Sequence, residues 1–330
     1  MRKLSVFLLL LPICLLVSAS CQPETNSLPS SLAIINGNKA CSPIDHIILS
    51  MHGDLIKHCP EASQLLSNYD GSAEAANDIF QCCFLRQANQ QRWELKDTYA
   101  YKREELFPYF AELGMTETVY PSSTEYDVIF IHGTTVPVMR IYFNFLQEIW
   151  AQGVRAKSIV LLTGRRKLDP VRDSDALMFD EQVAGVPFRI DWERPEEPPA
   201  YESDAMIMIW DQMILDDTLH ALTPTLIDAP QICDVKHKTC KRPNTRSTVT
   251  TWLENNPKPG KYLAISGNPF INYQDATMRI ELEEAGLFDE GATLETVGPA
   301  RPSITSTGIY LDNLARWIYT VYQHTLSNND

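Results

Sequence analysis

The chain has 330 residues, a formal net charge of -14 at pH 7 and a hydrophobic content of 44%. A surface that follows nucleic acid needs clustered Lys and Arg, and an acidic chain is repelled from anionic lipid headgroups. We therefore expect no nucleic-acid partner. We expect contact with a membrane only through an N-terminal lipid.

The first twenty residues are typical of a secretory signal peptide, because two basic residues precede the apolar run 4–17 and three small residues follow it. That run is short for a membrane span, and no later segment reaches the roughly 20 apolar residues that a span requires. We expect residues 1–20 to be removed on export. The mature chain then resides in the periplasm or cell envelope, with secretion as the alternative.

Cys21 is a candidate lipidation site. Cleavage after Ser20 would make Cys21 the first mature residue, where a bacterial lipoprotein carries its lipid. A lipoprotein signal usually has Leu three places before this cysteine, whereas this chain has Ser18. Lipidation and ordinary cleavage to a freely soluble protein therefore both stay open.

The mature chain divides by composition into a tether, an extension and a main domain. Residues 21–33 are rich in Ser, Pro, Asn and Thr, which is typical of a tether. Residues 34–120 are mostly helical in pattern, particularly from 42 to 113, and predict a helical extension.

From residue 121 to 330, short apolar strands alternate with amphipathic helices. In chain order we predict a strand at 127–131, a helix from 137, a strand at 158–162, a helix at 202–217, a strand at 226–227, a helix from 244 or 245, a strand at 262–265, a helix at 273–285, a strand at 293–297 and a helix at 308–324. This alternation indicates an α/β fold with a Rossmann-like, doubly wound, mostly parallel sheet. Right-handed crossovers place every strand-to-helix loop at one edge of such a sheet.

Six cysteines remain once Cys14 and Cys21 are set aside, and they predict disulfides, since an even number is typical of exported chains. The extension contains Cys41, Cys59, Cys82 and Cys83, and the main domain contains Cys233 and Cys240. We expect two bridges within the extension, of open connectivity, and one within the main domain. The two adjacent cysteines should have different partners, because a bridge between neighbours is strained. We expect no metal site, since zinc usually takes four ligands at short paired spacings.

Candidate ligand-binding residues follow the strands. Ligands of open parallel sheets bind beyond the carboxyl ends of the strands, where hydroxyls, glycines and helix N-termini can contact an anion. The residues of these loops, with one arginine of the following helix, are Gly133, Thr134, Arg140, Thr163, Gly164, Arg165, Arg166, Ser266, Gly267 and Asn268. In the alternative interpretation the glycines only turn the chain and the arginines pair with surface acids.

Two residues are candidates for acid–base chemistry. His132 follows a strand and could act as a general base, because its ordinary pKa is near neutrality; a neutral, structural histidine is the alternative. Glu202 opens a predicted helix, where it either complements the helix dipole or points into the ligand site. The sequence contains no Walker loop, no Gly-x-Gly-x-x-Gly and no Gly-x-Ser-x-Gly, which disfavours the usual ATP, NAD and α/β-hydrolase sites.

Short motifs occur in a fixed order between residues 124 and 285. They are YDVIFIHG from 126, LTGR from 162, Glu202 at a helix start, RPNTRST from 242, ISGNPF from 265 and YQ from 273. In this order they resemble the YdcF/SanA/ElyC-like domain family. The resemblance implies a Rossmann-like envelope protein, an association with nucleotide-like ligands or S-adenosylmethionine, and no settled activity.

The resemblance extends the candidate site and also has limits. It implies a site containing Gly133, Thr163, Gly164, Glu202 and Ser266, and it adds Asn244, Thr245 and Gln274. The loop 132–135 has less glycine than the family pattern. The sequence NPF at 268–270 replaces a form that contains histidine, which weakens any transfer of acid–base chemistry from that loop.

These features predict an exported envelope protein that binds a small anionic, phosphorylated or nucleotide-like ligand. If the protein also acts on that ligand, we expect transfer or hydrolysis at a phosphorylated envelope precursor, with Arg165 and Arg166 clamping the anion and Glu202 as acid or base. The alternative is a non-catalytic periplasmic or secreted interaction protein whose site is vestigial. The sequence identifies no cofactor and predicts no oligomeric state.

Overall fold

The computed structural model describes residues 31–87, 90–234 and 239–328. The predicted signal peptide, Cys21 and most of the predicted tether lie outside the described residues. Within the described ranges, no helix combines the length and the apolar character needed to cross a membrane.

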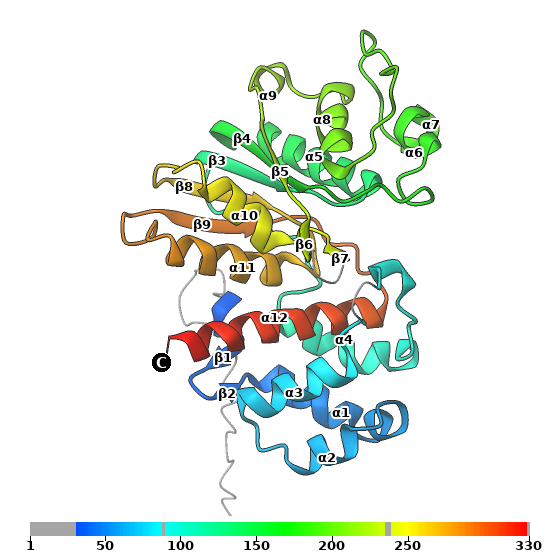
Figure 1. Ribbon diagram of the computed structural model, residues 1–330, viewed down its shortest axis with the longest axis vertical. Helices are drawn as coiled ribbons and strands as arrows, with labels where there is room; N and C mark the ends of the chain where they lie inside the picture. The colour runs from blue at the N-terminus through cyan, green and yellow to red at the C-terminus, as the bar shows by residue number, and fades with distance from the viewer. Residues whose placement is uncertain (1–30, 88–89, 235–238, 329–330) are drawn as a thin grey trace, which may run out of the picture.

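The centre of the molecule is a five-stranded parallel sheet (Figure 1). Its strands are β3 (Glu125–His132), β4 (Arg155–Gly164), β5 (Thr225–Ala229), β8 (Lys261–Ile265) and β9 (Thr293–Val297). The strand order is β5-β4-β3-β8-β9, and every neighbouring pair is parallel. The predicted α/β class and Rossmann-like parallel sheet are confirmed.

Helices cover both faces of the sheet because successive side chains of a strand point to opposite sides. Ile129 and Ile131 of β3 pack against α5 (Val136–Ala151) and α8 (Glu202–Gln212). Phe130, between them, packs on the other face with side chains of α10 and α11. The bounds of these two helices are Thr245–Leu253 and Ile271–Glu284. The sheet is therefore doubly wound.

A helical layer lies below the sheet in Figure 1. It contains α1 (Ser42–His58), α2 (Ala62–Ser67), α3 (Ala73–Cys83), α4 (Arg103–Glu112) and the closing helix α12 (Thr307–Ser327). One apolar core joins α12 to the extension through side chains such as Leu314 and Phe80. The sequence boundary at residue 120 therefore does not separate two packing units, since α12 comes from the main-domain segment.

Shorter elements complete the chain. They are β1 (Ile35–Asn36), β2 (Lys39–Ala40), β6 (Ile232–Asp234), β7 (Thr239–Lys241), α6 (Asp175–Phe179), α7 (Glu181–Ala184), α9 (Asp217–His220) and the 3-10 turns Ser31–Ile34, Arg92–Glu94 and Ala100–Lys102. The helix predicted at 202–217 was too long. It ends at Gln212, because Met213 is extended and forms a bridge with Phe188.

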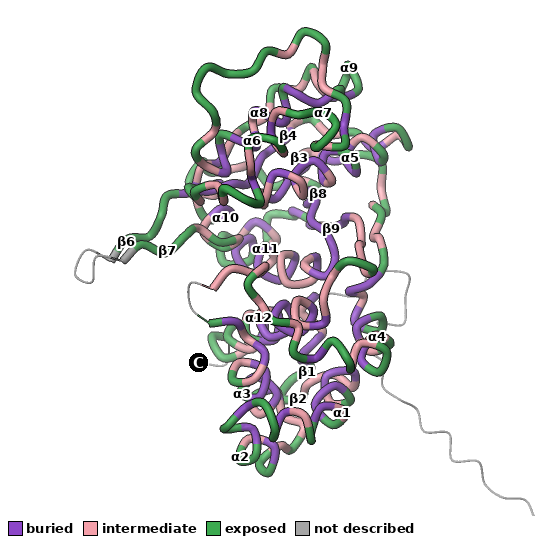
Figure 2. Tube along the Cα trace, turned by 90° about the vertical axis from the view of Figure 1, so that its right-hand side faces the viewer, coloured by how far each residue is buried: buried purple, intermediate pink, exposed green. Residues whose placement is uncertain are grey.

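The cysteine predictions have mixed outcomes. The bridge between Cys233 and Cys240 is confirmed, and it joins paired positions of the hairpin β6–β7, which projects from the body in Figure 2. The two bridges predicted within the extension are not formed in this structure, in which Cys59, Cys82 and Cys83 are free thiols. Cys41 and Cys59 cap opposite ends of the 17-residue α1 and so lie far apart, whereas Cys82 and Cys83 lie near Cys59.

Candidate functional site

The strand order defines where a ligand site can form. The chain crosses from β3 to β4 and β5 on one side, then returns to β8 on the other side of β3. The carboxyl ends of β3 and β8 are therefore neighbours at the point where strand order reverses, which is the usual ligand position of this fold. The loops after β3, β4 and β8 all begin at this edge.

The loops after β3 and β4 contact each other tightly. The Gly133 N–H donates to the Leu162 carbonyl at 2.7 Å. A Cβ placed on Gly133 would lie 2.4 Å from Glu202 Oε1 and 3.0 Å from Thr163 Cγ2. Gly133 is therefore required by the close approach of Glu202, and not by an unusual backbone angle.

Arg166, in the loop after β4, is hydrogen-bonded to Glu202, to Asp173 and to the loop after β3. Its Nε donates to Glu202 Oε2 at 2.7 Å, and its Nη1 donates to Asp173 Oδ2 at 3.0 Å. Its Nη2 donates to the Thr134 carbonyl at 2.8 Å. Asp173 also accepts the first helical N–H of α5, from Val136, at 2.8 Å. Most donors of Arg166 are therefore already engaged, so this arginine positions the loops and is a poor clamp for an incoming anion.

Glu202 is buried at the same place, with 8% of the residue exposed. Burial raises the pKa of its carboxyl, while Arg166, the Gly164 backbone N–H and Arg242 oppose that shift. Because Arg166 and Gly164 already hold this carboxyl, its observed role is to position neighbours. The structure shows no proton partner beyond them among the described residues.

His132 ends β3 and is 2% exposed. Burial lowers the pKa of its imidazole to about 4, so the ring is neutral near pH 7. Its Nε2 has no hydrogen-bond partner among the described residues. A ring with so low a pKa is a weak base, which favours the structural interpretation.

The loop after β8 approaches α5 and the extension. The Ser266 hydroxyl donates to Gln274 Oε1. A Cβ on Gly267 would lie 2.9 Å from the Tyr142 ring and 3.3 Å from its hydroxyl oxygen. The Asn268 amide donates to the carbonyls of Gly114 at 3.0 Å and Glu117 at 2.6 Å. Asn268 therefore attaches the extension to the sheet edge, with its donors already used.

Several predicted residues have other partners. Thr163 Oγ1 donates to the Ile227 carbonyl at 2.6 Å. Arg165, half exposed, pairs with Asp228 at 2.8 Å. A Cβ on Gly164 would lie 2.4 Å from Pro243.

Arg140 and the start of α10 also serve the fold. Arg140 is buried in α5 and donates to Gln212 Oε1 at 2.5 Å and to the carbonyls of Leu177 and Met178. It joins α5 to α6 and α8, away from the three loops. Asn244 caps α10 by accepting the Ser247 N–H at 3.0 Å, and Thr245 is the first residue of that helix.

A cluster of four arginines lies close to this edge, and sequence reasoning missed it. We call it the arginine cluster, and its members are Arg86, Arg92, Arg242 and Arg316. Burial, together with the charges of the other three arginines, lowers the pKa of Arg86 to about 10, against the opposing effect of Asp312. Arg242 also interacts with Arg166 and Glu202, which connects the cluster to the loops after β3 and β4.

One buried carboxylate lies within the cluster. Asp312 of α12 is 1% exposed and accepts from the Arg86 backbone N–H at 3.0 Å and from Arg86 Nη1 at 3.1 Å. Arg316 Nε contacts the same carboxylate at 3.3 Å. Arg92 and Arg242 form no ion pair with it. Asp312 is therefore paired with two of the four arginines, while Arg242 is attracted by the buried Glu202, which is itself paired with Arg166.

Arg92 connects the cluster to the loop after β8. Its guanidinium carbon lies 3.7 Å from the centre of the Phe270 ring, and its buried Nε has no hydrogen-bond partner among the described residues. Burial lowers the pKa of Arg92 to about 10, and the Tyr142 hydroxyl is among the nearby groups. Arg242 is exposed and donates to Gln91 Oε1 at 2.8 Å.

Comparisons of the chain with family models, curated proteins and solved structures found no match. The resemblance to the YdcF/SanA/ElyC-like domain family therefore stays a prediction from the motifs.

Proposed function

We propose that the protein binds a phosphorylated or other multiply charged anion beyond the carboxyl ends of β3 and β8. Arg92 and Arg242 are the proposed contacts, because neither forms an ion pair with Asp312. The observation that carries the proposal is that four guanidinium groups interact around one ion-paired carboxylate, Asp312, while the nearby Glu202 is already paired with Arg166.

Electrostatics supports an anion in preference to a neutral ligand. Like charges in a partly buried cluster repel one another, and a bound anion removes that repulsion. The buried Nε of Arg92 would also gain an acceptor. A guanidinium group binds phosphate or carboxylate through two parallel hydrogen bonds, which suits a phosphorylated or nucleotide-like molecule.

The proposal is one of binding. Glu202 and Arg166 neutralise each other, and His132 has a low pKa, so no described residue is left as an obvious acid or base at this edge. We assign Arg166 and Glu202 to positioning the loops, in place of the clamp and acid–base roles expected from the sequence.

We also propose that the chain is exported to the periplasm or cell envelope. The support is the signal-like segment 1–20 and the disulfide between Cys233 and Cys240, a bond that persists in oxidising compartments. The mass of the protein isolated from its host tests this: loss of residues 1–20 is expected, with an added lipid if Cys21 is modified. An uncleaved chain would contradict export through this signal.

The binding proposal is tested by calorimetric titration of the full mature chain with pyrophosphate. We expect Arg242→Ala to weaken binding by about tenfold to a hundredfold, since a hydrogen bond to a charged group contributes about 1.5–3 kcal/mol. Its side chain is exposed and its one described hydrogen bond goes to Gln91, so the fold should be retained.

The matched control is Lys157→Ala. Lys157 is 82% exposed and pairs with Asp127 near the amino end of β3, at the opposite edge of the sheet. Pyrophosphate affinity should be unchanged in this variant. Equal affinity of wild type and Arg242→Ala, or no binding by the wild type, would reject the proposal in favour of a non-catalytic interaction protein.

A further inference from the structure

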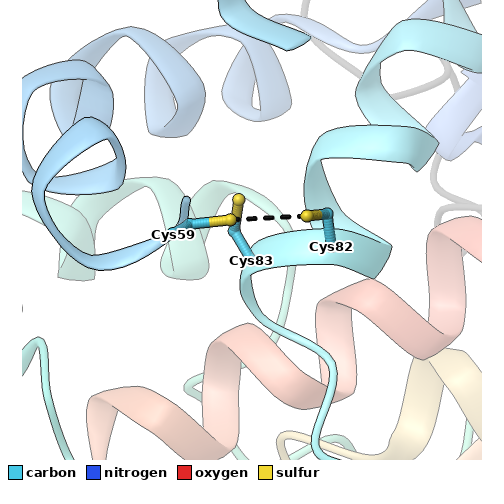
Figure 3. A group of neighbouring side chains, drawn as sticks. All are labelled: Cys59, Cys82 and Cys83. Atoms are coloured by element: carbon cyan, nitrogen blue, oxygen red, sulfur yellow. Dashed lines mark hydrogen bonds between the residues drawn. The ribbon is translucent and has the colours of Figure 1, made fainter. Parts of the chain in front are cut away.

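Three cysteine sulfurs meet in the helical layer, away from the sheet edge. Cys59 follows the end of α1, and Cys82 and Cys83 are the last two residues of α3. All three sulfur atoms lie within 4.8 Å of one another, and those of Cys59 and Cys82 are 3.4 Å apart (Figure 3). Among the described residues, these three cysteines form a group of side chains that could hold a metal ion.

Any disulfide formed among these three cysteines leaves one thiol unpaired. Cys59 can bond to one neighbour at a time, and a bridge between adjacent Cys82 and Cys83 is strained. Cys41 cannot take the remaining thiol, because it lies at the other end of α1, about 27 Å away at 1.5 Å per residue. A ligand that binds all three sulfurs at once leaves no thiol unpaired.

The geometry fits a metal ion bound by thiolates. Zinc–sulfur bonds are about 2.3 Å long, so sulfurs around one ion lie about 4 Å apart, within the observed limit. Glu61 Oε2 lies 3.7 Å from the Cys82 sulfur and can supply a fourth ligand. Thiolates select soft or borderline ions such as Cu⁺ and Zn²⁺ over Mg²⁺ or Ca²⁺.

Without an ion, the thiols of Cys82 and Cys83 favour their protonated form. Burial raises the pKa of Cys82 to about 11, and burial also raises that of Cys83 well above its ordinary value. Protonated thiols attack disulfides slowly, which disfavours a role in thiol–disulfide exchange. Binding of a metal ion would release their protons to solvent, so metal affinity should rise with pH.

We propose that Cys59, Cys82 and Cys83 bind one thiophilic closed-shell cation, Zn²⁺ or Cu⁺, with Glu61 as the fourth ligand for Zn²⁺. The ion joins the end of α1 to the end of α3 and so stabilises the helical layer. This proposal departs from the sequence expectation of no metal site, because the fold brings together Cys59 and Cys82, which are 23 positions apart in the chain.

The test uses the full mature chain, reduced and kept free of oxygen, and titrates it separately with Zn²⁺ and with Cu⁺. Native mass spectrometry should show one ion per chain, and the melting temperature should rise on binding. Cys59→Ser should weaken binding by more than about 100-fold, since even supporting residues of metal sites contribute 10- to 100-fold. Elemental analysis of the protein isolated from its native compartment identifies the resident metal, because affinity alone does not decide which ion is bound in the cell.

Cys41→Ser is the matched control, and its metal affinity and metal-induced rise in melting temperature should equal those of the wild type. Co²⁺ absorption provides a second readout, because thiolate-to-cobalt bands report sulfur ligation directly and should be lost in Cys59→Ser. The proposal is overturned if Cys59→Ser binds like wild type, or if Cys41→Ser loses affinity equally. Peptide mapping that finds Cys59 in a disulfide with Cys82 or Cys83 in protein from its native compartment would also overturn it.

Discussion

At the scale of single residues, two buried side chains make the sheet edge sensitive to conditions and to substitution. His132 is held neutral by burial, and Gly133, next to it, admits Glu202 where no larger residue fits. By sequence, His132 was a candidate general base and Gly133 a candidate for ligand contact. The structure gives each a packing role instead, since β3 ends inside the protein and Glu202 covers its loop.

The burial of His132 predicts a loss of stability in acid. Its pKa is about 4 in the folded state and near 6.5 when unfolded, so the unfolded chain binds a proton more readily. The stabilisation is complete above pH 6.5 and is lost as the pH falls towards 4, by about 3 kcal/mol at 1.36 kcal/mol per pKa unit. Urea unfolding of wild type and His132→Gln across this range measures it. A parallel pH dependence in the two proteins would contradict the burial of a neutral ring.

Gly133→Ala should be destabilising by about 1–3 kcal/mol, because its new Cβ would displace Glu202 and disturb the Arg166 pair. Gly53→Ala is the matched control. A Cβ at Gly53, within α1, meets nothing within 4 Å and should stabilise the helix by roughly 0.5–1 kcal/mol. The measurement is chemical denaturation of both variants. If the two substitutions changed the free energy of unfolding equally, Glu202 would not restrict the space around Gly133.

At the scale of elements, local pattern predicted the sheet well. The strand predicted at 293–297 matches β9, and the apolar runs at 127–131 and 158–162 lie inside β3 and β4. These segments are buried on both faces, so their composition alone indicates parallel strands. The two-residue strands β1 and β2 were not predicted, because two residues carry no periodicity. The packing of α12 on the extension was also missed. The spacing of apolar residues shows which face of a helix is buried, but it does not show which other helix covers that face.

Asp312 of α12 connects that helix to the extension and supports a prediction at this scale. Asp312→Ala leaves the Arg86 and Arg316 charges without a buried partner and should cost about 3–5 kcal/mol. Pyrophosphate should restore part of this loss, because a ligand that binds only the folded state stabilises it. Thermal unfolding with and without pyrophosphate measures both effects.

The exposed Asp211 of α8 supplies the control. Asp211→Ala should melt within about 0.5 kcal/mol of the wild type, as is usual for surface substitutions. If Asp312→Ala were equally mild, or if pyrophosphate stabilised it no more than the control, the arginine cluster would not act as a charged unit.

At the scale of the whole molecule, the candidate site belongs to three distant parts of the chain. The extension contributes Arg86 and Arg92, the turn before α10 contributes Arg242, and α12 contributes Arg316. Sequence reasoning predicted that the loops after β3, β4 and β8 begin at one edge of the sheet, because strand-to-helix loops are local, and the parallel sheet has them there. It could not find the arginine cluster, because the Arg86–Asp312 contact joins residues 226 apart. The helical layer therefore supplies charge to the edge.

Anion binding at Arg92 and Arg242 is tested most directly by locating a phosphate analogue in crystals of the mature protein. Tungstate carries the charge of a phosphate group and gives a strong anomalous signal. We expect an anomalous-difference peak beyond the carboxyl ends of β3 and β8, within hydrogen-bond distance of Arg92 and Arg242. A peak only elsewhere on the protein, with these guanidinium groups uncontacted, would contradict it.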